Sequence, residues 1–315
     1  MIINTENNHL HYWFNSDRSQ IWRHSNFDTT AMSVGGCLRP TMSLRAELIR
    51  NARSIYRNYP DLTLFMSGGL DSEMALRSFM SAGIIPKLAT IRFPNDNNMY
   101  DIGPMIRMVE QLKLKITVID FDPNEFVQSG EYKDVGLRYQ AYTLYQQMLL
   151  RVAEDYAAPM ITIDEVEVEK NPSIDFDTGK VTAEWIFLKK EDQDGVWRRF
   201  NDKTGIPALN NFYTYSPETI LAFLQNPTVD DLINDRIYGK LSWTSSKMKI
   251  YSSLRYEFRK RPKWHGMENY IHLWDAVRYN MSNSGLIFNS RSYSVPANLL
   301  KENLINGVET LCQVA

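Results

Sequence analysis

The six residues Ser-Gly-Gly-Leu-Asp-Ser at positions 67–72 form the clearest chemical pattern in the chain. The adjacent Gly68 and Gly69 allow a sharp turn that brings successive backbone N–H groups close to a ligand. A helix that begins here adds partial positive charge, and Ser67 and Ser72 supply hydroxyl groups at either end. A polyphosphate is the ligand that such a loop favours.

Asp71 needs a separate explanation, because a carboxylate that faces a phosphate would repel it. A divalent cation between the two groups removes the conflict, and Mg²⁺ binds both carboxylate and phosphate oxygens. The loop is therefore predicted to bind ATP with Mg²⁺, with backbone amides on two phosphates and Asp71 on the metal.

Three other loop motifs do not fit these residues. A Walker A loop requires a lysine after its last glycine, and a dinucleotide fingerprint requires the spacing G-x-G-x-x-G. A nucleophile elbow places its serine between two glycines, whereas Ser67 precedes both and Ser72 follows both. A plain turn with one capping residue explains one glycine and one cap, but not the whole hexad.

Strands and helices are expected to alternate around this loop. The expected strands are 62–66, 87–93, 115–121 and 160–168, and the expected helices are 42–59, 71–82, 102–113 and 137–157. Short apolar strands between amphipathic helices are typical of a parallel sheet covered on both faces. We expect an α/β fold with a doubly wound parallel sheet, and such sheets bind ligands at the carboxyl ends of their strands.

The chain is expected to have three parts. They are an N-terminal extension at 1–41, an ATP-binding domain at 42–170, and a hairpin plus a mostly helical substrate region at 171–315. The hairpin pattern alternates around Trp185, Phe187 and Trp197.

Composition narrows the classes of function. The 315 residues carry a net charge of -2 and 43% hydrophobic residues, as expected for a globular protein. Cys37 and Cys312 are the only cysteines, so this chain alone can build neither a disulfide framework nor a Cys-x-x-Cys zinc or redox motif. The N-terminus lacks the features of a signal peptide, and no run approaches the ~20 apolar residues that cross a bilayer. These features predict a cytoplasmic protein that does not act at a membrane.

The hexad resembles the PP-loop of the N-type ATP pyrophosphatases, the superfamily that includes asparagine synthetase, GMP synthetase and NAD synthetase. It matches that pattern at every fixed position, and the element order over 62–168 is similar to the adenine nucleotide alpha hydrolase-like (HUP type) fold. The resemblance implies that ATP is split between its α and β phosphates. AMP then joins a carbonyl or carboxylate oxygen of the substrate, and a nitrogen or sulfur nucleophile displaces it.

The resemblance also implies a set of site residues. The loop residues bind ATP: Ser67, Gly68, Gly69, Leu70, Asp71 and Ser72. The end of the second strand, Ile91, Arg92 and Phe93, would lie against adenine, although each also fits an ordinary buried strand. Asp164 and Glu165 would help Asp71 to hold Mg²⁺, or they belong to the solvated face of a strand.

A basic segment at 236–263 contains nine Lys or Arg residues and a single acid, Glu257. The resemblance implies that one lysine from this region neutralises the leaving pyrophosphate, and Lys247 and Lys249 are the candidates. Two other interpretations remain open. The segment could bind RNA, or most of it could be a solvated helix face.

These observations favour an asparagine synthetase-like ligase that adenylates a small carboxylate or carbonyl compound. The N-terminal 40 residues are too few for a glutaminase domain, so the nitrogen would come from ammonia, an amine or a partner subunit. Two widely separated cysteines argue against sulfur chemistry. The alternatives are an adenylating enzyme that modifies RNA or a nucleobase, and a nucleotide-binding regulator without turnover.

Overall fold

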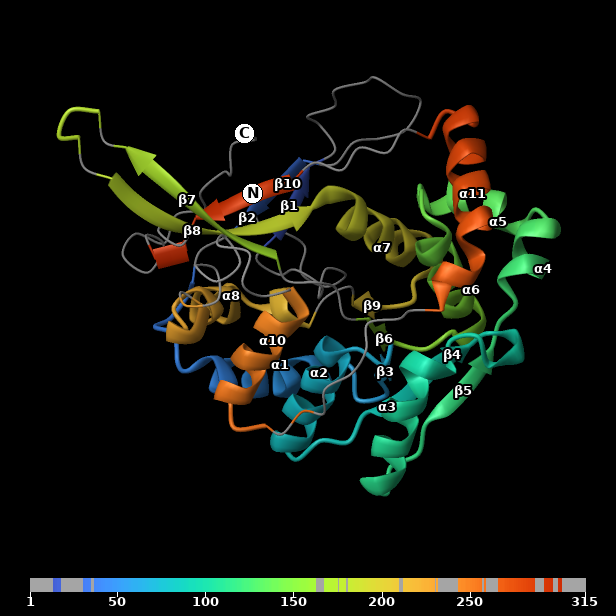
Figure 1. Cartoon of the computed structure of the whole chain (residues 1–315), viewed down its shortest axis with the longest axis horizontal. Helices are drawn as coiled ribbons and strands as arrows, with labels where there is room; N and C mark the ends of the chain where they lie inside the picture. Colours follow the sequence, from blue (N-terminus) through green and yellow to red (C-terminus); the bar gives the residue numbers. More distant parts are fainter. Residues whose placement is uncertain are drawn as a thin grey trace.

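The protein is described here by a computed structural model. It describes residues 14–17, 31–34, 37–162, 167–174, 176–179, 181–209, 212–229, 231, 243–256, 258, 266–286, 292–296 and 300–301. Its centre is a five-stranded parallel sheet with the strand order β5-β4-β3-β6-β9 (Figure 1). The strands are β3 (Thr63–Phe65), β4 (Lys87–Arg92), β5 (Thr117–Asp120), β6 (Met160–Ile161) and β9 (Ala208–Leu209).

The strand order reverses direction at β3. The chain runs outward from β3 to β4 and β5, then returns to place β6 on the other side of β3. Such a reversal opens a crevice at the carboxyl end of the central strand, where doubly wound sheets bind their ligands. The expected α/β fold with a doubly wound parallel sheet is confirmed, and the 67–72 loop follows β3 at this reversal point.

Helices cover both faces of the sheet. The chain contains α1 (Leu44–Asn58), α2 (Leu70–Ser81), α3 (Met99–Gln111), α4 (Pro123–Gln128), α5 (Glu131–Tyr139), α6 (Leu144–Tyr156), α7 (Glu191–Thr204), α8 (Pro217–Leu224), α10 (Trp243–Ser253) and α11 (Ile271–Asn283), with 3-10 turns η2 (Pro94–Asp96), η3 (Tyr213–Tyr215) and η4 (Met267–Tyr270). Helices α1, α2, α8 and α10 gather on one side, and α5, α6, α7 and α11 on the other (Figure 1). None of the helices in the described residues is long and apolar enough to cross a membrane.

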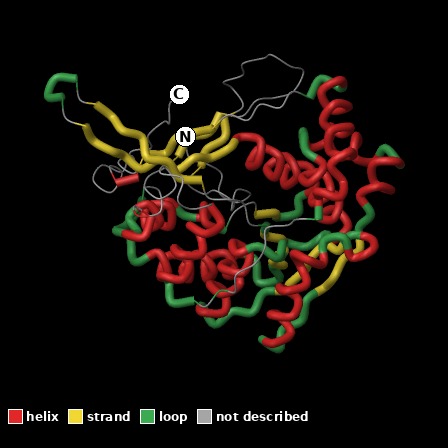
Figure 2. The backbone as a smooth tube through the Cα atoms, in the orientation of Figure 1, coloured by secondary structure: helices red, strands yellow, loops and turns green. Residues whose placement is uncertain are grey.

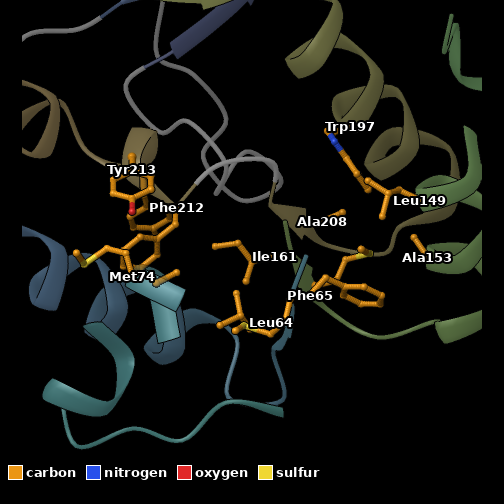
Figure 3. Packing of buried hydrophobic residues seen from close by; sticks show 14 of the residues in the cluster. Leu64, Phe65, Met74, Leu149, Ala153, Ile161, Trp197, Ala208, Phe212 and Tyr213 are labelled. Atoms are coloured by element: carbon orange, nitrogen blue, oxygen red, sulfur yellow. The ribbon is translucent and has the colours of Figure 1, made fainter. Parts of the chain in front are cut away.

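The core has two halves because neighbouring residues of a strand point to opposite faces. Leu64 faces the side of Met74 and Phe212, whereas Phe65 turns toward Leu149 on α6 (Figure 3). Phe65 also meets the ring of Tyr156 edge-on, with centroids 5.6 Å apart. Both halves exclude water, so β3 is held in place from both sides.

Two antiparallel units lie outside this sheet. Strands β7 (Glu167–Ile174) and β8 (Val181–Lys190) form a hairpin, and β10 (Ser292–Pro296) pairs with the other edge of β8. Strands β1 (Phe14–Asp17) and β2 (Ala31–Val34) form a separate pair. Figure 2 shows the hairpin sheet set apart from the short parallel strands. Strand β9, which follows the hairpin in sequence, nevertheless joins the parallel sheet beside β6.

Three expected elements differ from the structure. The helix expected at 137–157 is two helices, because Gln140 adopts a left-handed conformation (φ 55°) and Thr143 starts α6 with a capping box. The strand expected at 160–168 is divided between β6 and β7, which belong to different sheets. Trp197, expected in the hairpin, is buried on α7, where Val196, Trp197 and Phe200 share one helical face.

Candidate active site

The 67–72 loop begins where β3 is tied firmly to β4. The Met66 N–H donates to the carbonyl of Ala89 (2.8 Å), and the buried Thr90 hydroxyl donates to the carbonyl of Met66 (2.7 Å). The next residue, Ser67, therefore leaves the sheet from a fixed point. This anchoring positions the loop at the carboxyl edge of the sheet.

Gly68 is a position that only glycine fits. Its φ of +85° is left-handed, and a Cβ there would lie 2.6 Å from the carbonyl oxygen of Asp101. The two serines bond within the loop: the Gly69 N–H donates to Ser67 Oγ (3.3 Å), and Ser72 Oγ donates to the Gly69 carbonyl (2.9 Å). In this state the serines hold the shape of the loop.

Helix α2 starts directly at the loop with Gly69 as its N-cap, and no side chain in the described part of the chain caps it. The first N–H groups of a helix have no partner within the helix, so this end suits an anion. The first turn contains two acids, Asp71 and Glu73. Glu73 is buried, and Arg77 compensates its charge at 2.6 Å. Asp71, in contrast, is bonded by side chains from outside this helix.

Asp71 is contacted by two side chains from α10. Lys247 Nζ donates to Oδ2 at 2.7 Å, and the Tyr251 hydroxyl donates to Oδ1. Lys247 is only 6% exposed, although it is 176 positions away from Asp71 in sequence. The structure thus brings together Asp71 and Lys247, which the sequence analysis identified separately as candidate site residues. Lys249, the other candidate lysine, is exposed and lies roughly 200° around the helix from Lys247.

Tyr251 is fixed by a second tyrosine. Its ring stacks on Tyr213 from η3, with the planes 3° apart and the centroids 6.2 Å apart. Burial raises the pKa of both hydroxyls well above the usual value, and the negative charge of Asp71 raises them further. Tyr251 consequently stays protonated and acts as a hydrogen-bond donor. Sequence reasoning missed it, although its spacing of four from Lys247 places both on one helix face.

A second carboxylate that sequence reasoning missed lies beside the loop. Asp101 is in the first turn of α3, and a Cβ at Gly68 would lie 3.2 Å from its Cγ. Mg²⁺ is commonly held by one or two carboxylates together with substrate phosphates, so Asp71 and Asp101 fit this role. The described residues contain no group of three metal-ligating side chains. Asp164 and Glu165, the expected second ligands, lie outside the described residues.

The end of β4 is organised by Asn98. Its side-chain amide donates to the carbonyl of Ile91 (2.8 Å), and its amide oxygen accepts from the N–H of Phe93 (2.9 Å). Ile91 and Phe93 were expected to lie against adenine, and a base that bonded to these backbone groups would have to displace Asn98. Phe93 is buried and meets the ring of Tyr270 edge-on at 5.5 Å.

A cavity of about 460 Å³ lies at the carboxyl ends of β4 and β5. It is lined by 92–96, 120–122 and Glu125. Arg92, which was expected near adenine, lines it and makes a two-pronged ion pair with Asp120 at 2.6 and 3.1 Å. The other charged residues of the lining are acids, so the cavity suits a neutral or cationic group better than a phosphate.

Among known proteins, the matches to this chain lie in solved structures. No protein-family model matches the chain, and no curated protein matches its sequence. Solved structures that are similar to it include the three that follow. NMN synthetase from Francisella tularensis has 17% identity and a TM-score of 0.29, and the match covers 70% of this chain and 98% of that one.

The second is a predicted subunit of tRNA methyltransferase from Methanocaldococcus jannaschii (14% identity, TM-score 0.31), with 71% of this chain and 88% of that one covered. The third is glutamine-dependent NAD+ synthetase from Acinetobacter baumannii in complex with adenosine diphosphate (11% identity, TM-score 0.31). That match covers 76% of this chain and 52% of the synthetase.

Proposed function

We propose that this chain is a PP-loop ATP pyrophosphatase that forms AMP and pyrophosphate while it adenylates a small carboxylate or carbonyl compound. The observation that carries the proposal is the contact between Asp71 and Lys247. This contact joins a carboxylate that can hold a metal ion to a cation that can neutralise pyrophosphate. It lies at the start of a helix that follows a Gly-Gly loop.

The residues of the loop would bind and orient the triphosphate. The first N–H groups of α2 would hold the β and γ phosphates, and Gly68 lets the backbone approach them. Mg²⁺, when held by Asp71 and Asp101, supplies positive charge that stabilises the triphosphate. Most of the catalytic effect would come from positioning and from electrostatic stabilisation.

In the reaction, an oxygen of the substrate attacks the α-phosphorus and forms a new P–O bond. The bond from the α-phosphorus to the bridging oxygen breaks, and its electron pair leaves with pyrophosphate. Lys247 stabilises that negative charge. A nitrogen nucleophile then forms a bond to the activated carbon and loses a proton to water, and AMP departs with the electrons of the C–O bond.

Nitrogen chemistry is favoured over sulfur chemistry by the state of Cys37. The residue is buried, and burial together with nearby Glu218 and Glu47 raises its pKa to about 12. A thiol in this state is a poor nucleophile. The nitrogen donor would be ammonia, an amine or a partner subunit, and the cavity at the ends of β4 and β5 would take the nucleoside.

The test is incubation of the purified protein with ATP labelled with ³²P at the α or the γ position, together with Mg²⁺, an ammonium salt and a panel of small carboxylic acids. AMP and pyrophosphate in equal amounts support the proposal, whereas formation of ADP would overturn it. Asp71→Ala is expected to abolish turnover. Asp61→Ala is the matched control, because Asp61 is exposed and makes only a surface ion pair with Lys87 at 3.2 Å.

A further inference from the structure

Both carboxylate oxygens of Asp71 are engaged by donors of different mobility. Tyr251 bonds to Oδ1, and its ring is buried and stacked on Tyr213. Lys247 bonds to Oδ2 through an ammonium group on a flexible four-carbon stem. Tyr251 therefore cannot leave without repacking the core, whereas Lys247 can leave by rotating side-chain bonds. The two contacts are expected to behave differently when a ligand arrives.

The charges show when Lys247 would leave. With no nucleotide present, its ammonium compensates the carboxylate of Asp71 in a half-buried site, where the side chains are 8% and 22% exposed. A free divalent cation would have to displace this positive charge and would then be repelled by it at short range. A triphosphate changes the balance, because it offers the ammonium several negative charges within reach of the same loop.

We infer that Lys247 keeps Asp71 closed to free divalent cations and that the triphosphate opens the site by drawing Lys247 onto its own oxygens. Tyr251 is a positioning residue that stays on Oδ1 and fixes the carboxylate while Oδ2 becomes available. The inference rests on the proposed function, since it assumes that the loop binds ATP. Metal and nucleotide then bind together, and the metal alone does not bind.

The experiment measures Mn²⁺ binding by electron paramagnetic resonance, with and without α,β-methylene-ATP. Wild-type protein is expected to bind Mn²⁺ only when the nucleotide analogue is present. Lys247→Met should bind Mn²⁺ without nucleotide at least about tenfold more tightly than wild type, the factor expected on losing a competing charge-assisted hydrogen bond. Lys249→Met is the matched control, because it removes an equal charge from an exposed position of the same helix.

Tyr251→Phe tests how Tyr251 positions the Asp71 carboxylate, separately from how Lys247 closes it to metal ions. It should weaken Mn²⁺ binding in the presence of the analogue by about tenfold, as the loss of a hydrogen bond to a ligating carboxylate does. It should also leave the protein unable to bind Mn²⁺ alone. Asp71→Asn should abolish the binding of Mn²⁺ to the protein and so assign that binding to this carboxylate.

The inference is overturned if wild type binds Mn²⁺ equally well with and without the analogue, or if Lys247→Met and Lys249→Met bind free Mn²⁺ alike. The wild-type comparison decides the question even if Lys247→Met fails to fold, which circular dichroism would reveal. Binding of the analogue in the presence of Mg²⁺ is measured separately by calorimetry. No binding there would refute the proposed function, while the comparison of lysine variants with the metal alone would still test the closure of Asp71.

Discussion

Replacing Gly68 by alanine should damage the protein more than the same change at Gly83. Both glycines are left-handed, with φ of +85° and +78°, and they lie at opposite ends of α2. The left-handed conformation costs alanine roughly 1–2 kcal/mol at either position. At Gly68 the new Cβ would also collide with backbone, 2.6 Å from the oxygen and 2.9 Å from the carbon of the Asp101 carbonyl group. At Gly83, no atom of the described residues lies within 4 Å of the new Cβ.

Overpacking of this kind adds about 1–3 kcal/mol, so Gly68→Ala should lower the free energy of unfolding by about 2–5 kcal/mol and Gly83→Ala by about 1–2 kcal/mol. For a chain of 315 residues the first change corresponds to a fall in Tm of roughly 3–8 °C. Thermal unfolding followed by circular dichroism, with nucleotide affinity measured by calorimetry, checks both variants. If the loop relieves the collision by moving, ATP affinity should fall instead. The reasoning is refuted if Gly68→Ala melts within about 1 °C of Gly83→Ala and binds nucleotide like wild type.

Three further outcomes are expected. Lys247→Met should lower the rate of pyrophosphate release by about 100-fold or more, and Lys249→Met by less than about threefold; equal effects would contradict the assignment. Asn98→Ala removes the acceptor of a buried backbone N–H and should cost about 1–3 kcal/mol in thermal unfolding, and an unchanged Tm would mean that another group replaces the amide. In a Cys312→Ser background, Cys37 should not react with a disulfide reagent at pH 8, and rapid labelling of the folded protein would contradict its burial. Because its pKa of about 12 in the fold exceeds the ordinary value, the stabilisation from the neutral thiol is complete below about pH 8.5 and is lost as the pH rises toward 12.

Local patterns in the sequence predicted the elements nearest the loop. Helix α2 lies within one residue of the expected 71–82 because its apolar spacing and the terminating Gly83 are local signals. The expected strand at 160–168 was wrong for a reason that no local pattern contains. Met160 pairs with β3 and β9, whereas Glu167 pairs with β8, so the choice of partner divides one apolar run between two sheets.

The residues of the site could likewise be predicted only where a local sequence pattern marks them. The hexad could be recognised because all its members are adjacent, and the nine basic residues at 236–263 could be narrowed to two lysines. Which lysine reaches the loop depends on how α10 rotates against α2, and that rotation is set by buried contacts such as the stack of Tyr251 on Tyr213. Asp101 and Asn98 had no motif to mark them. Only the structure shows that they belong to the site: Asp101 closely approaches Gly68, and Asn98 makes two hydrogen bonds at the end of β4.

Residues from the C-terminal part of the chain contact two loops at this edge of the sheet, the loop after β3 and the loop after β4. Helix α10 supplies both donors to Asp71, and the turn at 266–270 packs against the loop after β4. A Cβ at Gly266 would lie 2.5 Å from that of Asn98, and the Asn97 amide donates to the Tyr270 hydroxyl at 3.0 Å. The sheet and its first helices alone would therefore present Asp71 without its compensating charge. Because the region that would hold the acceptor is built on these same contacts, a change in it should alter ATP binding as well as the choice of acceptor.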